Sequence, residues 1–220
     1  MKFWQHLFTK LQDQQHVYLL TVIENSGSSP GRKGFKMLVA QDGFIFGSVG
    51  GGVMEFSLVE EAQKLLKNQS PPIFLKKQVH QGNIKDGSGM ICSGEQTVVF
   101  HPLNSSHISV IKDILYCLQN NQRKTICFSP TSFALSDTEI TDNYQTSIHT
   151  NNDWSFKELI GFKNTLYIVG GGHVGLAVSE LFAKLGFYVV VLDALYWRIC
   201  KCFSPFFIGF LGCFWCLAHL

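Results

Sequence analysis

The chain has 220 residues, of which 46% are hydrophobic and 15% charged, with a formal net charge of +2. This composition is typical of a globular protein with an ample core and excludes a disordered chain. The small net charge gives no basic field of the kind that attracts nucleic acid, so we expect no nucleic-acid partner. Seven cysteines, several of them isolated, indicate free thiols in a reducing compartment, and we expect a cytoplasmic protein.

The first part of the chain alternates between helical and strand patterns. Apolar residues recur at helical spacing over residues 3–11, a segment too polar for a signal peptide. The apolar run 16–24 predicts a strand, and the runs 35–40 and 44–47 around a glycine-containing turn predict a β-hairpin. A helix over residues 53–68 should end before two prolines. Strands are also expected over 73–79, 96–101 and 124–128, a loop over 81–94 and a helix over 108–118.

The composition becomes polar over residues 136–153, within a segment 136–164 that separates this part from a second one. Its composition fits either meandering polar strands or a domain connector, and we favour a connector. A strand, a helix and a second strand are expected after it, over residues 165–169, 174–185 and 187–192. The expected fold class is α/β, with a first domain over 1–135 and a partial Rossmann-type βαβ unit over 165–194.

Three consecutive glycines, Gly50, Gly51 and Gly52, stand directly before the second expected helix. A glycine turn that opens a helix leaves N–H groups without a partner, and these favour an anion. The cations Arg32 and Lys36 are close by in the sequence. The pattern fits an anion or phosphate pocket, and it equally fits a tight turn whose glycines serve only packing.

A second glycine pattern, GxGxxG, is formed by Gly170, Gly172 and Gly175 between the expected strand and helix, and Asp193 ends the following strand. In a dinucleotide site the first glycines allow the tight turn and the last allows close helix packing. The helix start receives a pyrophosphate and the acid binds a ribose hydroxyl. The pattern predicts a site for NAD(P) or another nucleotide, although one βαβ unit is only part of a complete binding sheet.

The segment 195–220 is crowded with Phe, Trp and Cys and shows neither the helical nor the strand period. It could be a membrane anchor, because residues 203–220 carry no charge apart from a histidine. It could also be a metal site, made by the pairs Cys200/Cys202 and Cys213/Cys216. The third interpretation, which we favour, is out-of-frame or truncated coding sequence.

Three motifs of the first part occur in a specific order and spacing: Gly27-Ser28-Ser29-Pro30 followed by Gly34 and Met37; Gly47-Ser48-Val49-Gly50-Gly51-Gly52 followed by Glu55; and Gly89-Met90-Ile91-Cys92-Ser93-Gly94. With them the chain resembles the XdhC/CoxI family of molybdoenzyme maturation factors, also called xanthine dehydrogenase accessory proteins. Gly31 stands where that family tends to place arginine, and Ser93 replaces a glycine. The similarity stops at Ala194.

The resemblance implies a mixed α/β domain that binds the molybdenum cofactor (molybdopterin) and delivers it to an apo molybdenum hydroxylase such as xanthine dehydrogenase. It also implies a sulfurtransferase as a possible further partner, and a homo-oligomer. The residues expected to bind this cofactor are Arg32, Lys36, Gly50, Gly51, Gly52, Glu55 and Cys92. The Cys92 thiolate would contact molybdenum, or the residue is a small buried apolar one. Glu55 is either a helix-start acid or a group that faces the ligand.

An NAD(P)-dependent oxidoreductase that uses Gly170–Asp193 is the alternative function. Against it, no acid/base pair and no Ser/Tyr/Lys set accompanies the second glycine pattern. We therefore expect no catalytic residues, and an accessory protein rather than an enzyme.

Overall fold

The computed structural model describes all residues except 69, 81–93, 162–163, 194–195 and 203–220, and for His80 and residues 196–202 it describes the backbone only. The chain forms two compact units, Met1–Ile160 and Gly161–Leu220. Each unit is a separate combination of helices and sheets, so the predicted α/β class is confirmed.

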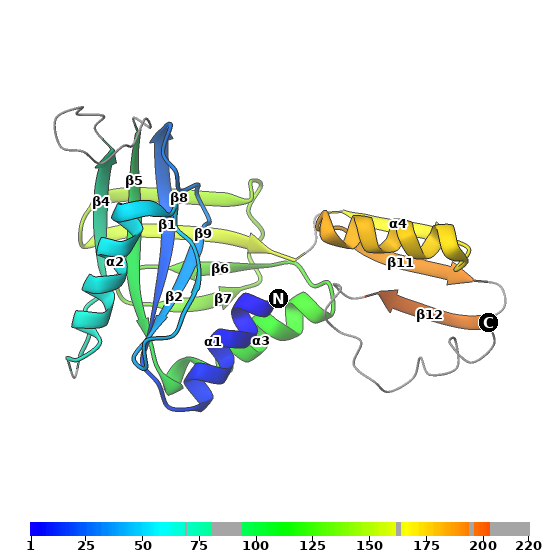
Figure 1. Ribbon diagram of the computed structural model, residues 1–220, viewed down its shortest axis with the longest axis horizontal. Coiled ribbons are helices and arrows are strands. Elements are labelled where there is room, and N and C mark those ends of the chain that lie inside the picture. Colours follow the sequence, from blue (N-terminus) through cyan, green and yellow to red (C-terminus); the bar gives the residue numbers. More distant parts are fainter. Residues whose placement is uncertain (69, 81–93, 162–163, 194–195, 203–220) are drawn as a thin grey trace. The chain divides into compact units, whose positions relative to one another are not determined.

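The first unit contains a five-stranded antiparallel sheet in the order β3-β2-β1-β5-β4 (Figure 1). Its strands are β1 (Val17–Gly27), β2 (Lys36–Ala40), β3 (Ile45–Gly47), β4 (Phe74–His80) and β5 (Gly94–Leu103). The predicted hairpin is therefore confirmed as β2–β3. Gly43 in its turn has φ of 88°, a value that glycine adopts easily.

The central strand β1 is buried on both faces, and its side chains alternate between two cores. One core takes Val17, Leu19 and Ile23, and the other takes Tyr18, Leu20 and Val22. Because successive side chains of a strand point to opposite faces, a strand covered on both sides needs apolar residues at every position. This explains why residues 17–23 of β1 are apolar apart from the buried Thr21.

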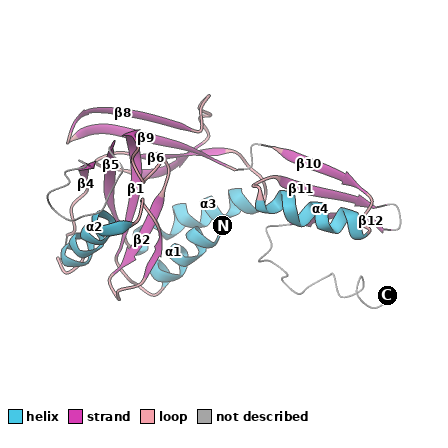
Figure 2. Ribbon diagram, turned by 45° about the horizontal axis from the view of Figure 1, so that its top comes forward, coloured by secondary structure: helices cyan, strands magenta, loops and turns pink. Residues whose placement is uncertain are grey.

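Three helices cover this sheet. Helix α2 (Gly52–Leu65) closes one core with Leu58 and Ala62. Helices α1 (Lys2–Gln12) and α3 (Ile108–Gln119), the latter preceded by the short 3-10 turn η1 (Ser105–His107), lie side by side and bury their apolar faces in the other core (Figure 2). The buried residues of these two helices are Trp4, Leu7, Leu11, Ile111, Ile114 and Cys117.

A second antiparallel sheet completes the first unit and corrects the expected connector. It has the order β7-β6-β9-β8 and consists of β6 (Lys124–Phe128), β7 (Phe133–Ser136), β8 (Tyr144–Thr150) and β9 (Asp153–Ile160). Trp154 and Phe156 point into the core, while the alternate residues are polar. The segment 136–164 is therefore mostly meandering strand, and the unit continues to Ile160 rather than ending at residue 135.

The second unit begins with the predicted strand, helix and strand. These are β10 (Thr165–Val169), α4 (His173–Lys184) and β11 (Tyr188–Asp193). The two strands are parallel and adjacent, and β12 (Tyr196–Cys202) pairs antiparallel with β11. The second unit leaves large apolar side chains exposed, among them Tyr167, Val169, Val174, Leu176, Leu181 and Leu185.

The proposed membrane anchor over 203–220 and the cysteine pair Cys213/Cys216 lie outside the described residues. No helix in the described part of the chain is long and apolar enough to span a bilayer.

Candidate functional site

Two loops that are distant in sequence meet in the first unit. We call residues 27–34, between β1 and β2, the serine loop, and residues 47–52, between β3 and α2, the glycine turn. A Cβ atom added to Gly50 would lie 2.8 Å from the backbone nitrogen of Gly31, and one added to Gly31 would overlap the carbonyl oxygen of Val49. The two backbones therefore touch at positions where no side chain fits. The first two sequence motifs thus form one surface.

The conformation of the glycine turn requires its three consecutive glycines. Gly50, Gly51 and Gly52 have φ values of 137°, 78° and 74°, in a region that other residues rarely adopt. The helix α2 begins at the last of them. The glycines are thus needed for the backbone path itself, whether or not a ligand approaches.

Glu55 closes the glycine turn from within α2. Its Oε2 accepts hydrogen bonds from Ser48 Oγ at 2.7 Å, from the Val49 amide at 2.8 Å and from the Gly51 amide at 2.9 Å. A carboxylate in the first turn is also favoured by the helix dipole. Of the two roles expected for Glu55, the geometry favours the helix-start acid. Two backbone N–H groups that an anion could have used are already taken.

Gln96 on β5 is a buried polar residue that we did not predict as part of the site. Its side chain is only 3% exposed. Its Oε1 accepts hydrogen bonds from Ser29 Oγ at 2.9 Å and from the Gly31 amide at 3.0 Å. Its Nε2 donates to the Val49 carbonyl oxygen at 3.1 Å. A single side chain therefore holds both loops.

Gln78 on β4 extends this contact to α2. It stands opposite Gln96 in the sheet, and its Oε1 accepts from Gln96 Nε2 at 2.9 Å. Its own Nε2 donates to the carbonyl oxygen of Met54 at 3.0 Å. The side chains of Gln78 and Gln96 therefore connect the two loops to α2 by hydrogen bonds. The sequence does carry one signal for these contacts, a glutamine within each of the two expected strands. Glutamine is rarely fully buried, so a glutamine inside a strand that packs in the core is unusual.

The two predicted cations have different surroundings. Arg32 is exposed and has no ion pair among the described residues. Lys36 is paired with Glu158 of β9 at 2.5 Å, with side-chain exposures of 10% and 13%, and it donates to the Gly34 carbonyl oxygen at 3.0 Å. The role of Lys36 as a ligand-binding cation stays a prediction. Its charge is used within the fold to join β2 to the second sheet.

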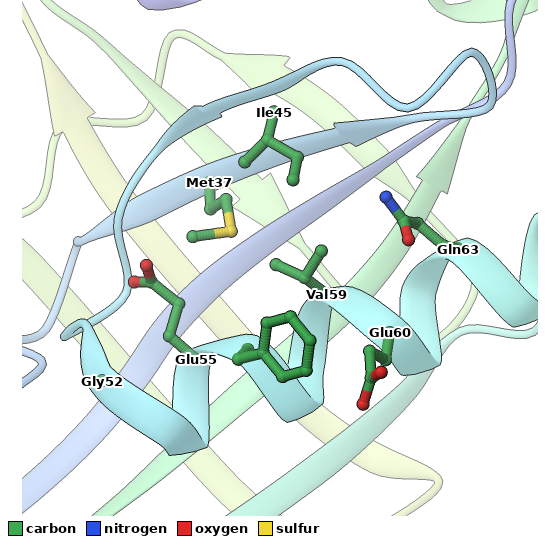
Figure 3. Close-up of a pocket in the computed structure, with 8 residues that line it drawn as sticks. Met37, Ile45, Gly52, Glu55, Val59, Glu60 and Gln63 are labelled. Carbon is green, nitrogen blue, oxygen red and sulfur yellow. The ribbon is translucent and has the colours of Figure 1, made fainter.

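A pocket of about 390 Å³ lies beside the glycine turn, between α2 and the β2–β3 hairpin (Figure 3). Its lining residues are Met37, Ile45, Gly52, Glu55, Phe56, Val59, Glu60 and Gln63. In Figure 3, Met37, Ile45 and Val59 point toward one another across the pocket. Apolar walls with carboxylates at the edge do not favour a phosphate, because like charges repel. The pocket suits the uncharged part of a ligand better.

Cys92, the predicted thiolate ligand, lies outside the described residues, and its role remains a prediction. Gly94, which ends the third motif and begins β5, packs against the serine loop, because a Cβ atom there would lie 2.5 Å from the Ser29 nitrogen. The free thiols of Cys117 and Cys127 are poor candidates for the same chemistry. Burial raises the pKa of both groups and so disfavours the thiolate.

The second unit brings its predicted glycines and acid together. A Cβ atom on Gly175 would overlap the carbonyl oxygen of Gly170, so α4 passes close to the turn as a dinucleotide motif requires. Asp193 Oδ2 accepts a hydrogen bond from the Gly171 amide at 2.6 Å. Gly172 caps α4, and a Cβ atom there would meet nothing within 4 Å. The start of α4 is therefore open to a ligand.

The sequence model of the XdhC and CoxI family matches residues 11–76. This part of the chain is similar to that family. The match includes the serine loop, the glycine turn and α2, which are the segments joined by the contact between Gly31 and Gly50. The resemblance of the first two motifs to XdhC/CoxI proteins is thereby confirmed.

Two further comparisons extend over most of the chain. YqeB of Escherichia coli (strain K12), described as an uncharacterized protein, is 24% identical over 184 residues, which are 84% of this chain and 23% of YqeB. A solved structure described as a xanthine dehydrogenase from Bacillus halodurans aligns with a TM-score of 0.58 and 24% identity. That alignment covers 86% of this chain and 61% of the other. The chain thus spans less than two thirds of each relative, and the structural likeness supports the α/β fold.

Proposed function

We propose that the XdhC/CoxI domain is an accessory factor of a molybdenum hydroxylase. In this proposal it binds the molybdenum cofactor at the paired loops and delivers it to the apo-enzyme. The family match and the likeness to a structure described as a xanthine dehydrogenase support the accessory role. The observation that carries the proposal is the contact between Gly31 and Gly50, because it joins two family motifs into one surface.

The cargo in this proposal is a pterin that carries a phosphate or a dinucleotide. We assign its negative charge to the exposed guanidinium of Arg32, because Glu55 already takes the Val49 and Gly51 amides at the start of α2. The apolar pocket beside the glycine turn is suited to an uncharged ring. Because Glu55 and Lys36 are occupied within the fold, they would shape the site rather than hold the cargo.

The metal end of the cargo is assigned to Cys92. A thiolate is a soft ligand that suits molybdenum, and it could also relay sulfur supplied by a sulfurtransferase. The partners that this proposal requires are an apo molybdenum hydroxylase as recipient and, for the sulfur step, that sulfurtransferase. A homo-oligomer is compatible with delivery and belongs to the same proposal.

Co-elution of molybdenum tests this function. The purified protein is incubated anaerobically with molybdenum cofactor and desalted, and the retained metal is quantified. We expect stoichiometric metal on the wild type, little on Cys92→Ala, and at least about tenfold weaker retention on Arg32→Ala, since a charged hydrogen bond contributes about 1.5–3 kcal/mol. Arg123→Ala, an exposed arginine after α3, is the matched control. Absence of metal on a folded wild type would contradict the proposal.

We propose a nucleotide site in the second unit as a separate candidate, supported by the open start of α4 and the close passage of Gly175 past Gly170. NAD(P) would place its pyrophosphate at Gly172 and a ribose hydroxyl at Asp193, as in the dinucleotide motif. This proposal covers binding and not hydride transfer. Titration of NADH against the wild type and Asp193→Ala tests it, and lack of binding by either protein would reject it.

A further inference from the structure

Gln96 uses its complete hydrogen-bonding capacity. A glutamine amide has two acceptor positions on its oxygen and two N–H donors. In Gln96 the oxygen receives Ser29 Oγ and the Gly31 amide, while the nitrogen donates to Val49 and Gln78. Because the residue is 3% exposed, water cannot replace a partner that moves away. Displacing one loop would leave a buried polar group without a partner.

The four bonds lead to different segments of the site. Two hold the serine loop, one holds the glycine turn, and the fourth passes through Gln78 to Met54 in the first turn of α2. Networks of buried hydrogen bonds reinforce one another, so their members form and break together. The direct backbone contact between Gly31 and Gly50 adds a steric constraint in the same place.

We propose that Gln96 couples the serine loop to the glycine turn, so that the two loops form one binding element that orders and opens as a unit. Gln96 is then a positioning residue for the cargo. The coupling itself depends only on the contacts above, whereas its effect on molybdenum cofactor retention rests on the proposed function.

Amide hydrogen exchange in Gln96→Met tests the coupling without any ligand. Methionine keeps the approximate volume and removes all four hydrogen bonds. The decisive amides are Val49 and Gly51, because they donate to Glu55 and not to Gln96. We expect both to exchange about tenfold faster in the variant, the effect of losing a coupled buried hydrogen bond. Faster exchange at Gly31 alone, with Val49 and Gly51 unchanged, would overturn the coupling.

Two further variants accompany this measurement, one as a control and one as a substitute if Gln96→Met does not fold. Ile114→Val trims the core at α3, away from both loops, and should leave the three amides at their wild-type rates. If Gln96→Met does not fold, Gln78→Met removes the link to Met54 while Gln96 stays in place. In that variant we expect a smaller acceleration at the same amides, and wild-type rates would again overturn the coupling.

The variant Gln96→Glu tests whether this coupling affects the retention of molybdenum cofactor. A carboxylate can accept from Ser29 and Gly31, but it cannot donate to Val49 until it is protonated. We expect about tenfold weaker retention of molybdenum cofactor than in the wild type at neutral pH, with partial recovery of the ratio at lower pH. A pH-independent ratio would contradict the positioning role. If the wild type retains no metal, the proposed function fails, and the exchange rates still decide the coupling.

Discussion

The two glycine turns of this molecule have similar sequences but differ in what their glycines contact. Each precedes a helix, and each is held by a carboxylate, Glu55 in the first unit and Asp193 in the second. In the first turn Gly50 is pressed against another backbone, although Gly51, which caps α2, faces open space as Gly172 does in the second turn. A glycine cluster therefore does not identify a ligand site by itself. The first turn uses glycine to join two loops, and the second leaves room at a helix start.

The largest effect is expected from Gly31→Val, which places a side chain where the two loops of the first unit are in contact. A side chain at this position would overlap Val49 and Gln96, so both loops would have to separate. We expect a loss of about 3 kcal/mol in the free energy of unfolding, the upper range for overpacking. Urea denaturation followed by circular dichroism measures it. A loss below about 1 kcal/mol would mean that the loops are not packed together.

Acid should lower the free energy of unfolding of the first unit, because His101 is buried there. Burial, with a smaller contribution from the charge of His107, lowers the pKa of His101 from its ordinary 6.5 to about 4. The unfolded chain therefore binds a proton that the folded chain resists, and stability falls as the pH drops below 6.5. We expect a loss of about 2 kcal/mol between pH 7 and pH 5. Unfolding curves at the two pH values measure it, and in His101→Leu the loss should be smaller.

Glu55→Gln should have a moderate effect on the first turn. The amide oxygen can still accept hydrogen bonds, but the charge that strengthens the three bonds of Glu55 is lost. We expect a loss of about 1 kcal/mol in the free energy of unfolding. Glu60→Gln, an exposed change one turn later in α2, is the control and should be nearly neutral. Equal effects of the two changes would show that Glu55 does not hold the turn.

Gly172→Ala, in the second glycine turn, should have the smallest effect on stability. Its φ of −68° is accessible to alanine, and the added methyl group meets no atom. We expect the free energy of unfolding to change by less than about 0.5 kcal/mol. If the second unit binds a nucleotide at α4, the same change should weaken NADH binding, because the methyl group occupies the ligand's space. A large loss of stability would show that the turn is not open.

Much of the fold could be predicted from the sequence because local patterns determine it. The apolar run of β1, the hairpin β2–β3 and the series β10, α4 and β11 all appear where the periodicity places them. The strands β8 and β9 were only the less favoured alternative for their segment, because one face is solvated and this makes the segment look like a connector. The alternation of Trp154 and Phe156 with polar neighbours was the available signal.

The candidate site was harder to predict because its contacts are long-range. The motifs containing Gly31 and Gly50 could be recognised, but their contact depends on the packing of two distant loops. Likewise, nothing near Lys36 in the sequence indicates that Glu158 will neutralise it. The partners of Gln96 are mostly backbone groups, which every residue carries. A sequence pattern therefore cannot identify them.

The position of β1 between β2 and β5 also has a consequence for synthesis on the ribosome. The partner residues on β2 end at Ala40, whereas those on β5 begin only at Gly94. During translation β1 therefore carries one unpaired edge and apolar side chains on both faces until β5 has emerged. Such late, long-range pairing slows folding. Newly made chains should consequently depend on chaperones, and refolding from denaturant should be slow and more efficient in dilute solution.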